Sequence, residues 1–264
     1  MAKKNKRTTA RVTNSKTFEG AIWAVFQPYA LKLMDDEHAW RKAMRERDPT
    51  GRLPLPVQNR NVRGDDLLIH RIFLAYREIT LSLDTLNNIP FYMRHMPLPV
   101  LRKAKSAIWR GLPDSRSAWV RYHVENYFHE LYIFQNRAKA FFTLLRKSYR
   151  KQPYLPELKK RCDALEGDLK TGMAGVVRVR GGHVHDTRFD DVDLRIIESQ
   201  EFLLRLNKIS EREYRDFFQE AQTMKTFWMK DTTKELEKWL NEVGVILGKL
   251  LFSETGEFRF PSPP

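Results

Sequence analysis

Apolar residues recur at the spacing of an α-helix along most of this chain, and this periodicity limits the possible folds more than any other feature of the sequence. A clear run follows Pro156, at steps of four, three, four and seven residues: Leu158, Cys162, Leu165, Leu169 and Val176. Such steps place these side chains on one side of a helix. Few segments alternate between apolar and polar residues, and turn dipeptides of the β-hairpin type are missing. We therefore expect an all-α fold.

Short polar motifs predict where several helices start. Ser210 with Glu213, and Thr232 with Glu235, match the capping box, in which a hydroxyl and a carboxylate each accept from a free backbone amide. The helices expected from these motifs span about residues 211–230 and 233–252. The acidic pair before Val192 favours another helix start near residue 191, because negative charge is stabilised at the amino end of a helix.

Prolines and glycines predict the breaks between helices. One break is expected from Pro90 through Pro99 to Pro113, and a tight one at residues 153–156. An aromatic-rich helix is expected between these breaks, from about residue 117 to 149. The helix after Pro156 is expected to end around Arg180, where two glycines follow.

We expect four parts along the chain. Residues 1–16 are basic and poor in large apolar groups, which is typical of a disordered tail. Residues 17–64 form an N-terminal helical segment and a Pro-rich connection, residues 65–254 form the bundle of long amphipathic helices, and residues 255–264 form a C-terminal tail.

The charge of the chain points to a polyanionic partner. Lys and Arg number 47 against 33 Asp and Glu, so the formal net charge is +14 in 264 residues. Such a surface attracts phosphate groups, and RNA, DNA and anionic lipid are the candidate partners. The apolar runs are too short to cross a bilayer, and the single cysteine, Cys162, is expected in the core. We therefore expect a cytoplasmic protein with no membrane segment.

The segment 177–186 is the part of the sequence richest in chemically active side chains: Arg178, Arg180, His183, His185 and Asp186 surround a Gly-Gly pair. It lies on an expected connection between two helices. A histidine can move a proton near neutral pH, and a nearby guanidinium can hold phosphate oxygens. These two groups suffice to cut RNA without a metal.

This segment resembles the HEPN family, whose motif is an arginine followed after four to six residues by a histidine near the junction of two helices. The chain matches it with Arg180 and His185, and also with Arg178 and His183. The residue after each arginine is Gly181 or Val179, where many members have a polar residue. The resemblance covers about residues 65–252.

The resemblance implies an up-and-down helical bundle with additional N-terminal helices, and a metal-independent endoribonuclease or RNA-binding protein without a cofactor. In the ribonucleases of this family the histidine serves acid-base chemistry, the arginine steadies the phosphate and the 2′-hydroxyl attacks. It further implies a homodimer, a role as a toxin or in defence against phage, and a regulatory partner such as an antitoxin.

Other interpretations of the same segment remain open. His183, His185 and Asp186 have a spacing that could bind a divalent cation, although no further ligand completes the set. They could also be surface residues of a basic protein. The chain as a whole could be a non-catalytic nucleic-acid-binding or scaffold protein, or a module that binds lipid or protein.

A polar stripe on the expected helix 117–149 supports a shared site. Its members are His123, Asn126, Glu130 and Arg137, which lie within roughly 40 degrees of one another at helical spacing. Glu130 is a candidate to orient a catalytic histidine, and Asn126 and Arg137 are candidates to contact RNA. Structural pairing between helices explains the same stripe equally well.

Two basic runs extend the candidate RNA-binding path. The first, from Arg94 to Arg110, has no acid and is flanked by Tyr92 and Trp109; its candidate RNA contacts are Arg102, Lys103 and Lys105. The second, from Arg146 to Arg161, includes the candidates Arg146 and Lys147 and the aromatics Tyr149 and Tyr154. Exposed aromatics would stack on RNA bases, whereas buried ones would belong to the core.

Overall fold

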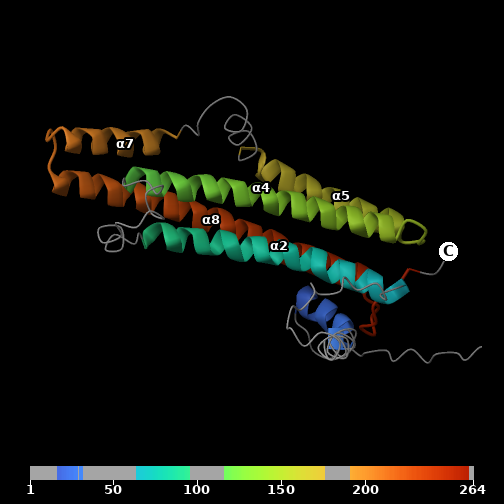
Figure 1. The fold of residues 1–264 in the computed structure, drawn as a ribbon. Coiled ribbons are helices and arrows are strands. Elements are labelled where there is room, and N and C mark those ends of the chain that lie inside the picture. Colours follow the sequence, from blue (N-terminus) through green and yellow to red (C-terminus); the bar gives the residue numbers. More distant parts are fainter. Residues whose placement is uncertain (1–16, 29, 32–63, 96–115, 176–190, 262–264) are drawn as a thin grey trace, which may run out of the picture. The chain divides into compact units, whose positions relative to one another are not determined.

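The computed structural model describes residues 17–28, 30–31, 64–95, 116–175 and 191–261. Over these residues the chain is an all-α helical bundle, as the periodicity predicts (Figure 1). The long helices are α2 (Gly64–Arg94), α4 (Arg116–Ser148), α5 (Leu155–Gly172), α7 (Val192–Arg205) and α8 (Glu211–Leu251). A further helix begins at residue 18, where the Thr17 hydroxyl accepts from the Gly20 amide at 3.2 Å.

Two of the predicted helix starts are confirmed, with the expected capping contacts. At the start of α8 the Ser210 amide donates to Glu213 Oε2 at 2.7 Å, and the Glu213 amide donates to Ser210 Oγ at 3.2 Å. At the start of α7 the Leu194 amide donates to Asp191 Oδ1 at 3.1 Å. In both cases the side chain next to the helix satisfies an amide that has no partner inside it.

The predicted helix start at Thr232 is wrong, because α8 continues through it to Leu251. The neighbouring Thr233 does not cap anything. Its hydroxyl donates to the Met229 carbonyl one turn back, at 2.8 Å. Neither Gly nor Pro occurs between Ser210 and Gly244, so nothing in the backbone interrupts the helix.

Two predicted helix boundaries also differ from the structure. Pro90 does not begin a break but lies inside the last turns of α2. Ile89 and Met93 on either side of it are buried, and their packing holds the helix in spite of the missing amide donor. The helix after Pro156 ends at Gly172, well before Arg180, because glycines at 172 and 175 already lower helix propensity there.

The chain divides into two compact units, each with its own core. The first consists of the described residues within 1–78, together with 140–165 and 240–264. In it the N-terminal helix packs on α2 and on the end of α8. The Phe18 ring lies 5.1 Å from the Tyr76 ring, and Phe26 stacks on Phe73 at 4.5 Å. A Cβ at Gly244 would lie 3.1 Å from that of Phe18, so a glycine permits this close approach.

Four helices pack together in the second unit, residues 79–139 and 166–239: α2, α4, α7 and α8. Helix α4 runs parallel to α8, since Tyr127 bonds to the Met229 carbonyl and Phe134 packs on Trp239. Helix α2 runs antiparallel to α4, since Ser82 lies near Arg137. The core of this unit is aromatic and aliphatic, with few buried polar groups.

Candidate nucleic-acid interface

The connection between α4 and α5 is a short turn fixed by backbone hydrogen bonds. The amides of Gln152 and Leu155 donate to the carbonyls of Tyr149 and Gln152, each at 3.0 Å. The rings of Tyr149 and Tyr154 pack with their centres 5.8 Å apart, and the Arg259 guanidinium lies 6.0 Å from the centre of the Tyr154 ring. The turn therefore has a defined backbone from which its side chains project.

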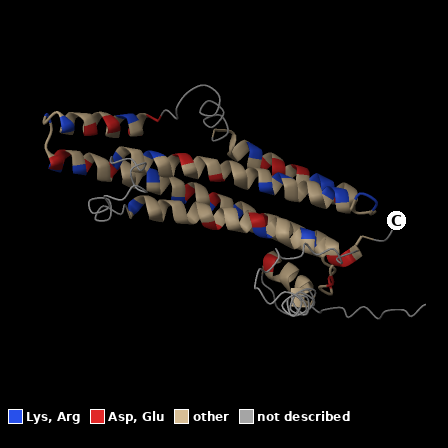
Figure 2. Cartoon of the chain, viewed as in Figure 1, with Lys and Arg blue, Asp and Glu red and all other residues tan. Residues whose placement is uncertain are grey.

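Basic side chains surround this turn, and we call residues 146–161 the basic hairpin. It contains seven Lys or Arg residues and one acid, Glu157. Figure 2 shows Lys and Arg concentrated at the connection from α4 to α5. The exposed ones are Lys147, Arg150, Lys151, Lys159, Lys160 and Arg161. The candidate Lys147 is thus exposed, whereas Arg146 is half-buried.

Ion pairs account for only two of these cations. Arg146 Nη1 lies 2.8 Å from Asp163 Oδ1 and links α4 to α5, so this candidate RNA contact has a structural partner. Arg161 Nε lies 2.7 Å from Glu157 Oε1, one turn away on α5. The remaining cations of the hairpin have no ion pair within the described parts of the chain: Lys147, Arg150, Lys151, Lys159 and Lys160. Exposed and unpaired, they are suited to contact phosphates.

The aromatic residues of the basic hairpin are part of the core. Tyr149 is wholly buried, and burial raises the pKa of its phenol. Tyr154 is half-buried, and burial also raises its pKa. Neither ring offers an open face to a nucleic-acid base, so of the two possibilities for these aromatics the structure shows the core position. The basic hairpin can therefore supply phosphate contacts without stacking.

The polar stripe on α4 meets α2 rather than solvent. Ser82 of α2 is fully buried and donates from Oγ to Glu130 Oε1 at 2.6 Å. Arg137 Nη1 donates to the same Ser82 Oγ at 2.6 Å and lies 3.7 Å from Glu130 Oε1. The structure thus brings Glu130 and Arg137 together through a serine that sequence reasoning did not single out. These contacts pair α4 with α2, which is the structural explanation of the stripe.

The two other members of the stripe differ from each other in their surroundings. Asn126 is half-buried. His123 is only 6% exposed, and neither ring nitrogen has a hydrogen-bond partner. The rings of Trp119 and Tyr122 meet it edge-on, at 4.5 and 5.2 Å between centres. Burial lowers the pKa of His123 to about 4, so the imidazole is neutral at physiological pH.

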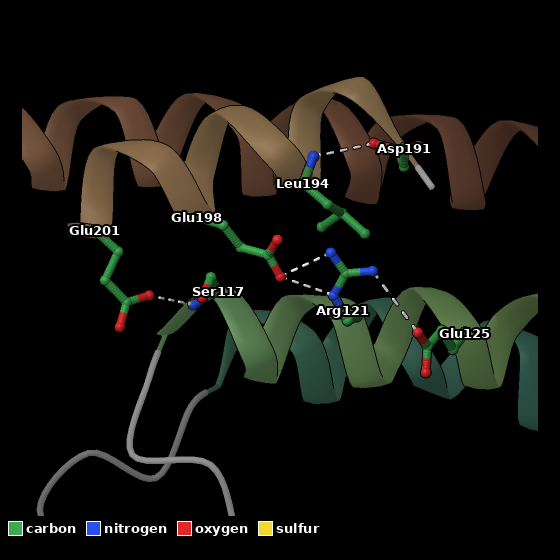
Figure 3. A network of polar contacts seen from close by, with 7 residues as sticks. All are labelled: Ser117, Arg121, Glu125, Asp191, Leu194, Glu198 and Glu201. Carbon is green, nitrogen blue, oxygen red and sulfur yellow. Dashed lines mark hydrogen bonds and ion pairs between the residues drawn. The ribbon is translucent and has the colours of Figure 1, made fainter. Parts of the chain in front are cut away.

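A second polar network, shown in Figure 3, holds α7 against α4. Arg121 donates from Nε and Nη2 to Glu198 Oε1 at 2.9 and 2.7 Å, and its Nη1 lies 3.9 Å from Glu125. At the start of α4 the Ser117 amide donates to Glu201 Oε2 at 3.1 Å. Glu201 therefore caps α4 from another helix, where the positive end of the helix dipole favours a carboxylate.

Sequence reasoning did not identify this network. The two glutamates of α7 are three residues apart, and this spacing on one helical face was the signal that could have been noticed. Nothing in the sequence indicates which helix they face. The network joins elements nearly a third of the chain apart, and its buried charges stabilise the fold rather than form an open site.

Several of the candidate residues lie outside the described residues, so the structure neither places nor tests them. They include both Arg–His motifs and the centre of the first basic run: Arg102, Lys103, Lys105, Arg178, Arg180, His183 and His185. The metal-ligand set of His183, His185 and Asp186 lies there as well. Within the described ranges, no group of three or more His, Cys, Asp or Glu side chains could hold a metal ion.

The described helices include none that is long and apolar enough to cross a bilayer. Cys162 is buried in the first unit, as its place in the apolar stripe predicts. Comparisons of the chain with protein families, with curated proteins and with solved structures give no match. The functional argument therefore depends on the chemistry of the chain itself.

Proposed function

We propose that this chain binds RNA through the basic hairpin and that its two Arg–His motifs make it a metal-independent endoribonuclease of the HEPN kind. One observation carries the RNA-binding part: five exposed and unpaired cations on one ordered turn, namely Lys147, Arg150, Lys151, Lys159 and Lys160. The net charge of +14 favours the same partner, because it attracts polyanions from a distance.

The catalytic part of the proposal follows from the motif residues. In this mechanism the imidazole of His185 takes the proton of a 2′-hydroxyl as that oxygen attacks phosphorus, and the 5′-oxygen of the next nucleotide leaves with a proton. The guanidinium of Arg180 neutralises charge on the phosphate oxygens. Arg178 and His183 form the alternative pair. On this proposal we also expect a cytoplasmic homodimer and a regulatory protein partner, as for toxins or phage-defence proteins.

Loss of charge from the basic hairpin tests RNA binding. The variant Lys159→Gln with Lys160→Gln should bind single-stranded RNA about tenfold more weakly at low salt, because each lost phosphate contact removes roughly 0.7 from the slope of log affinity against log salt. The measurement is fluorescence anisotropy over a range of salt concentrations.

The matched control carries the same charge change on another surface: Lys230→Gln with Lys234→Gln, both exposed on α8. Its salt slope should equal that of the native chain. Equal weakening by both double variants would mean that net charge alone attracts RNA, and the basic hairpin would then not be the interface.

Removal of the histidines tests catalysis. The native chain should cut mixed RNA in the presence of a chelator, and His185→Ala or His183→Ala should slow cutting by roughly 100-fold or more, because a general acid-base group contributes about that factor. RNA affinity should stay unchanged in the same variants. Binding without any cutting by the native chain would support the non-catalytic RNA-binding alternative.

A further inference from the structure

The carboxyl end of α2 presents an exposed aromatic surface. Asn88, Phe91, Tyr92 and His95 are three or four residues apart along the helix, so they share one face, and we call them the terminal stripe. All four are exposed, with Phe91 at 55% and Tyr92 at 54%. Large rings left in water at adjacent positions are uncommon on a folded surface and often mark a binding site.

The rings of the terminal stripe are held in a fixed arrangement. Phe91 and His95 lie 4.1 Å apart between ring centres, with their planes inclined by 30°. His95 Nδ1 lies 2.8 Å from the Phe91 carbonyl oxygen, which fixes the imidazole against the last turn of the helix. The Tyr92 ring meets Phe91 edge-on at 5.8 Å. A partner that binds here loses little ring freedom that the free chain had.

The helix end beneath these rings is anchored on its other side. Met93 is fully buried, and its carbonyl accepts from Trp119 Nε1 at 3.2 Å and from Gln222 Nε2 at 2.7 Å. These bonds satisfy a carbonyl that the end of the helix leaves without an amide donor. The terminal stripe is therefore presented by a rigid element, with α4 and α8 packed against the opposite side.

We propose that the terminal stripe stacks unpaired bases of single-stranded RNA. The inference rests on the proposed RNA-binding function and adds to it the preferred form of the substrate. Flat rings stack on the face of any base, and the amide of Asn88 can both donate to and accept from a base edge. Exposed Arg94 lies beside the stripe and supplies a cation for the backbone.

The composition of the terminal stripe and the charge of the chain favour RNA over a protein partner. Its members are aromatic rings, an imidazole and an amide, whereas a groove for a partner helix is lined mainly by aliphatic side chains at regular spacing. The basic hairpin complements this surface: its cations reach the phosphates, and its own tyrosines are buried. Stacking and phosphate contact are therefore assigned to different residues of the chain.

The test compares Phe91→Ala with Tyr92→Ala against a matched control, Phe217→Ala with Phe227→Ala, which removes two exposed rings from α8. The probes are a 2′-O-methyl RNA single strand containing 2-aminopurine and a blunt duplex of the same length. Neither probe can be cut by attack of a 2′-hydroxyl. We expect the terminal-stripe variant to bind the single strand at least about tenfold more weakly and to lose quenching of 2-aminopurine. Duplex affinity and the control variant should be unchanged.

Other results would overturn the inference in distinguishable ways. If the native chain bound neither probe, the proposed function would fail along with the stacking site. If the native chain bound both probes and the terminal-stripe variant bound them as tightly, stacking would fail while RNA binding stood. If that variant changed only the oligomeric state seen by sedimentation, the terminal stripe would be an interface between copies of the chain.

Discussion

Replacing Glu198 with alanine is expected to lower the free energy of unfolding by about 2 kcal/mol, because it leaves a buried guanidinium without its main partner. The Arg121 side chain is 7% exposed, and two of its nitrogens bond to one oxygen of Glu198. The loss should stay below the roughly 3–5 kcal/mol typical of fully buried pairs, since Glu198 is 38% exposed and Glu125 remains nearby.

The partner substitution should be milder. Arg121→Met keeps most of the buried stem and leaves behind a glutamate that water can reach, so we expect a loss of less than about 1 kcal/mol. The double variant should resemble Arg121→Met alone and be more stable than Glu198→Ala. Urea denaturation gives these values from the shift in midpoint. Additive losses in the double variant would show that the two side chains do not interact.

This pair matters for function because α7 buries little apolar surface. Its buried residues are Leu194, Ile197 and Glu201, so polar contacts supply much of what holds it. Lys225 adds to them, since its Nζ lies 2.7 Å from both Asp191 and Asp193. Helix α7 directly follows the segment that carries the Arg–His motifs in the sequence. Glu198→Ala should therefore also reduce RNA cutting if the position of α7 orients those motifs.

The second large effect is expected from His123 at acid pH. Its pKa is lowered from 6.5 to about 4 in the folded chain. At about pH 8 the imidazole is neutral in both the folded and the unfolded chain, so it adds no pH dependence there. Between pH 6.5 and about 4 the unfolded chain takes up a proton that the folded chain does not. The free energy of unfolding should then fall with pH, by about 3 kcal/mol in all.

His123→Leu should remove this acid sensitivity. Leucine is close in volume to histidine and leaves no buried nitrogen unpaired, so we also expect a gain of about 1 kcal/mol at neutral pH. Urea midpoints at about pH 8 and pH 4.5 measure both effects. The matched control, His129→Leu, changes an exposed residue of the same helix. An equal drop in stability with pH for native and His123→Leu chains would contradict the assignment.

The sequence predicted those parts of the fold that depend on local rules. The helix starts at Asp191 and Ser210 were identified because each cap is a contact between residues three apart. The same local rule failed at Thr232, since a capping pattern inside an uninterrupted helical run is overridden by the packing of α8. Pro90 was misjudged for the same reason, because burial on both sides of it extends α2.

For the candidate interface, the sequence predicted composition but not exposure. The basic run from Arg146 to Arg161 was evident, and so was the polar stripe on α4. Whether an aromatic in such a run stacks on RNA or packs in the core depends on which side of the helix meets a neighbour. Tyr149 is buried and Tyr92 is exposed, although both lie near the end of a long helix among basic residues.

The sequence by itself determined that this protein is helical, strongly basic and equipped with two Arg–His motifs, because periodicity, net charge and residue spacing are properties of the chain in one dimension. Only the tertiary structure decided that Ser82 joins Glu130 to Arg137, that Glu198 holds Arg121, and that Phe91 and Tyr92 face solvent. These contacts join helices far apart in the chain, and their partners are set by the packing of whole helices, which no short pattern encodes.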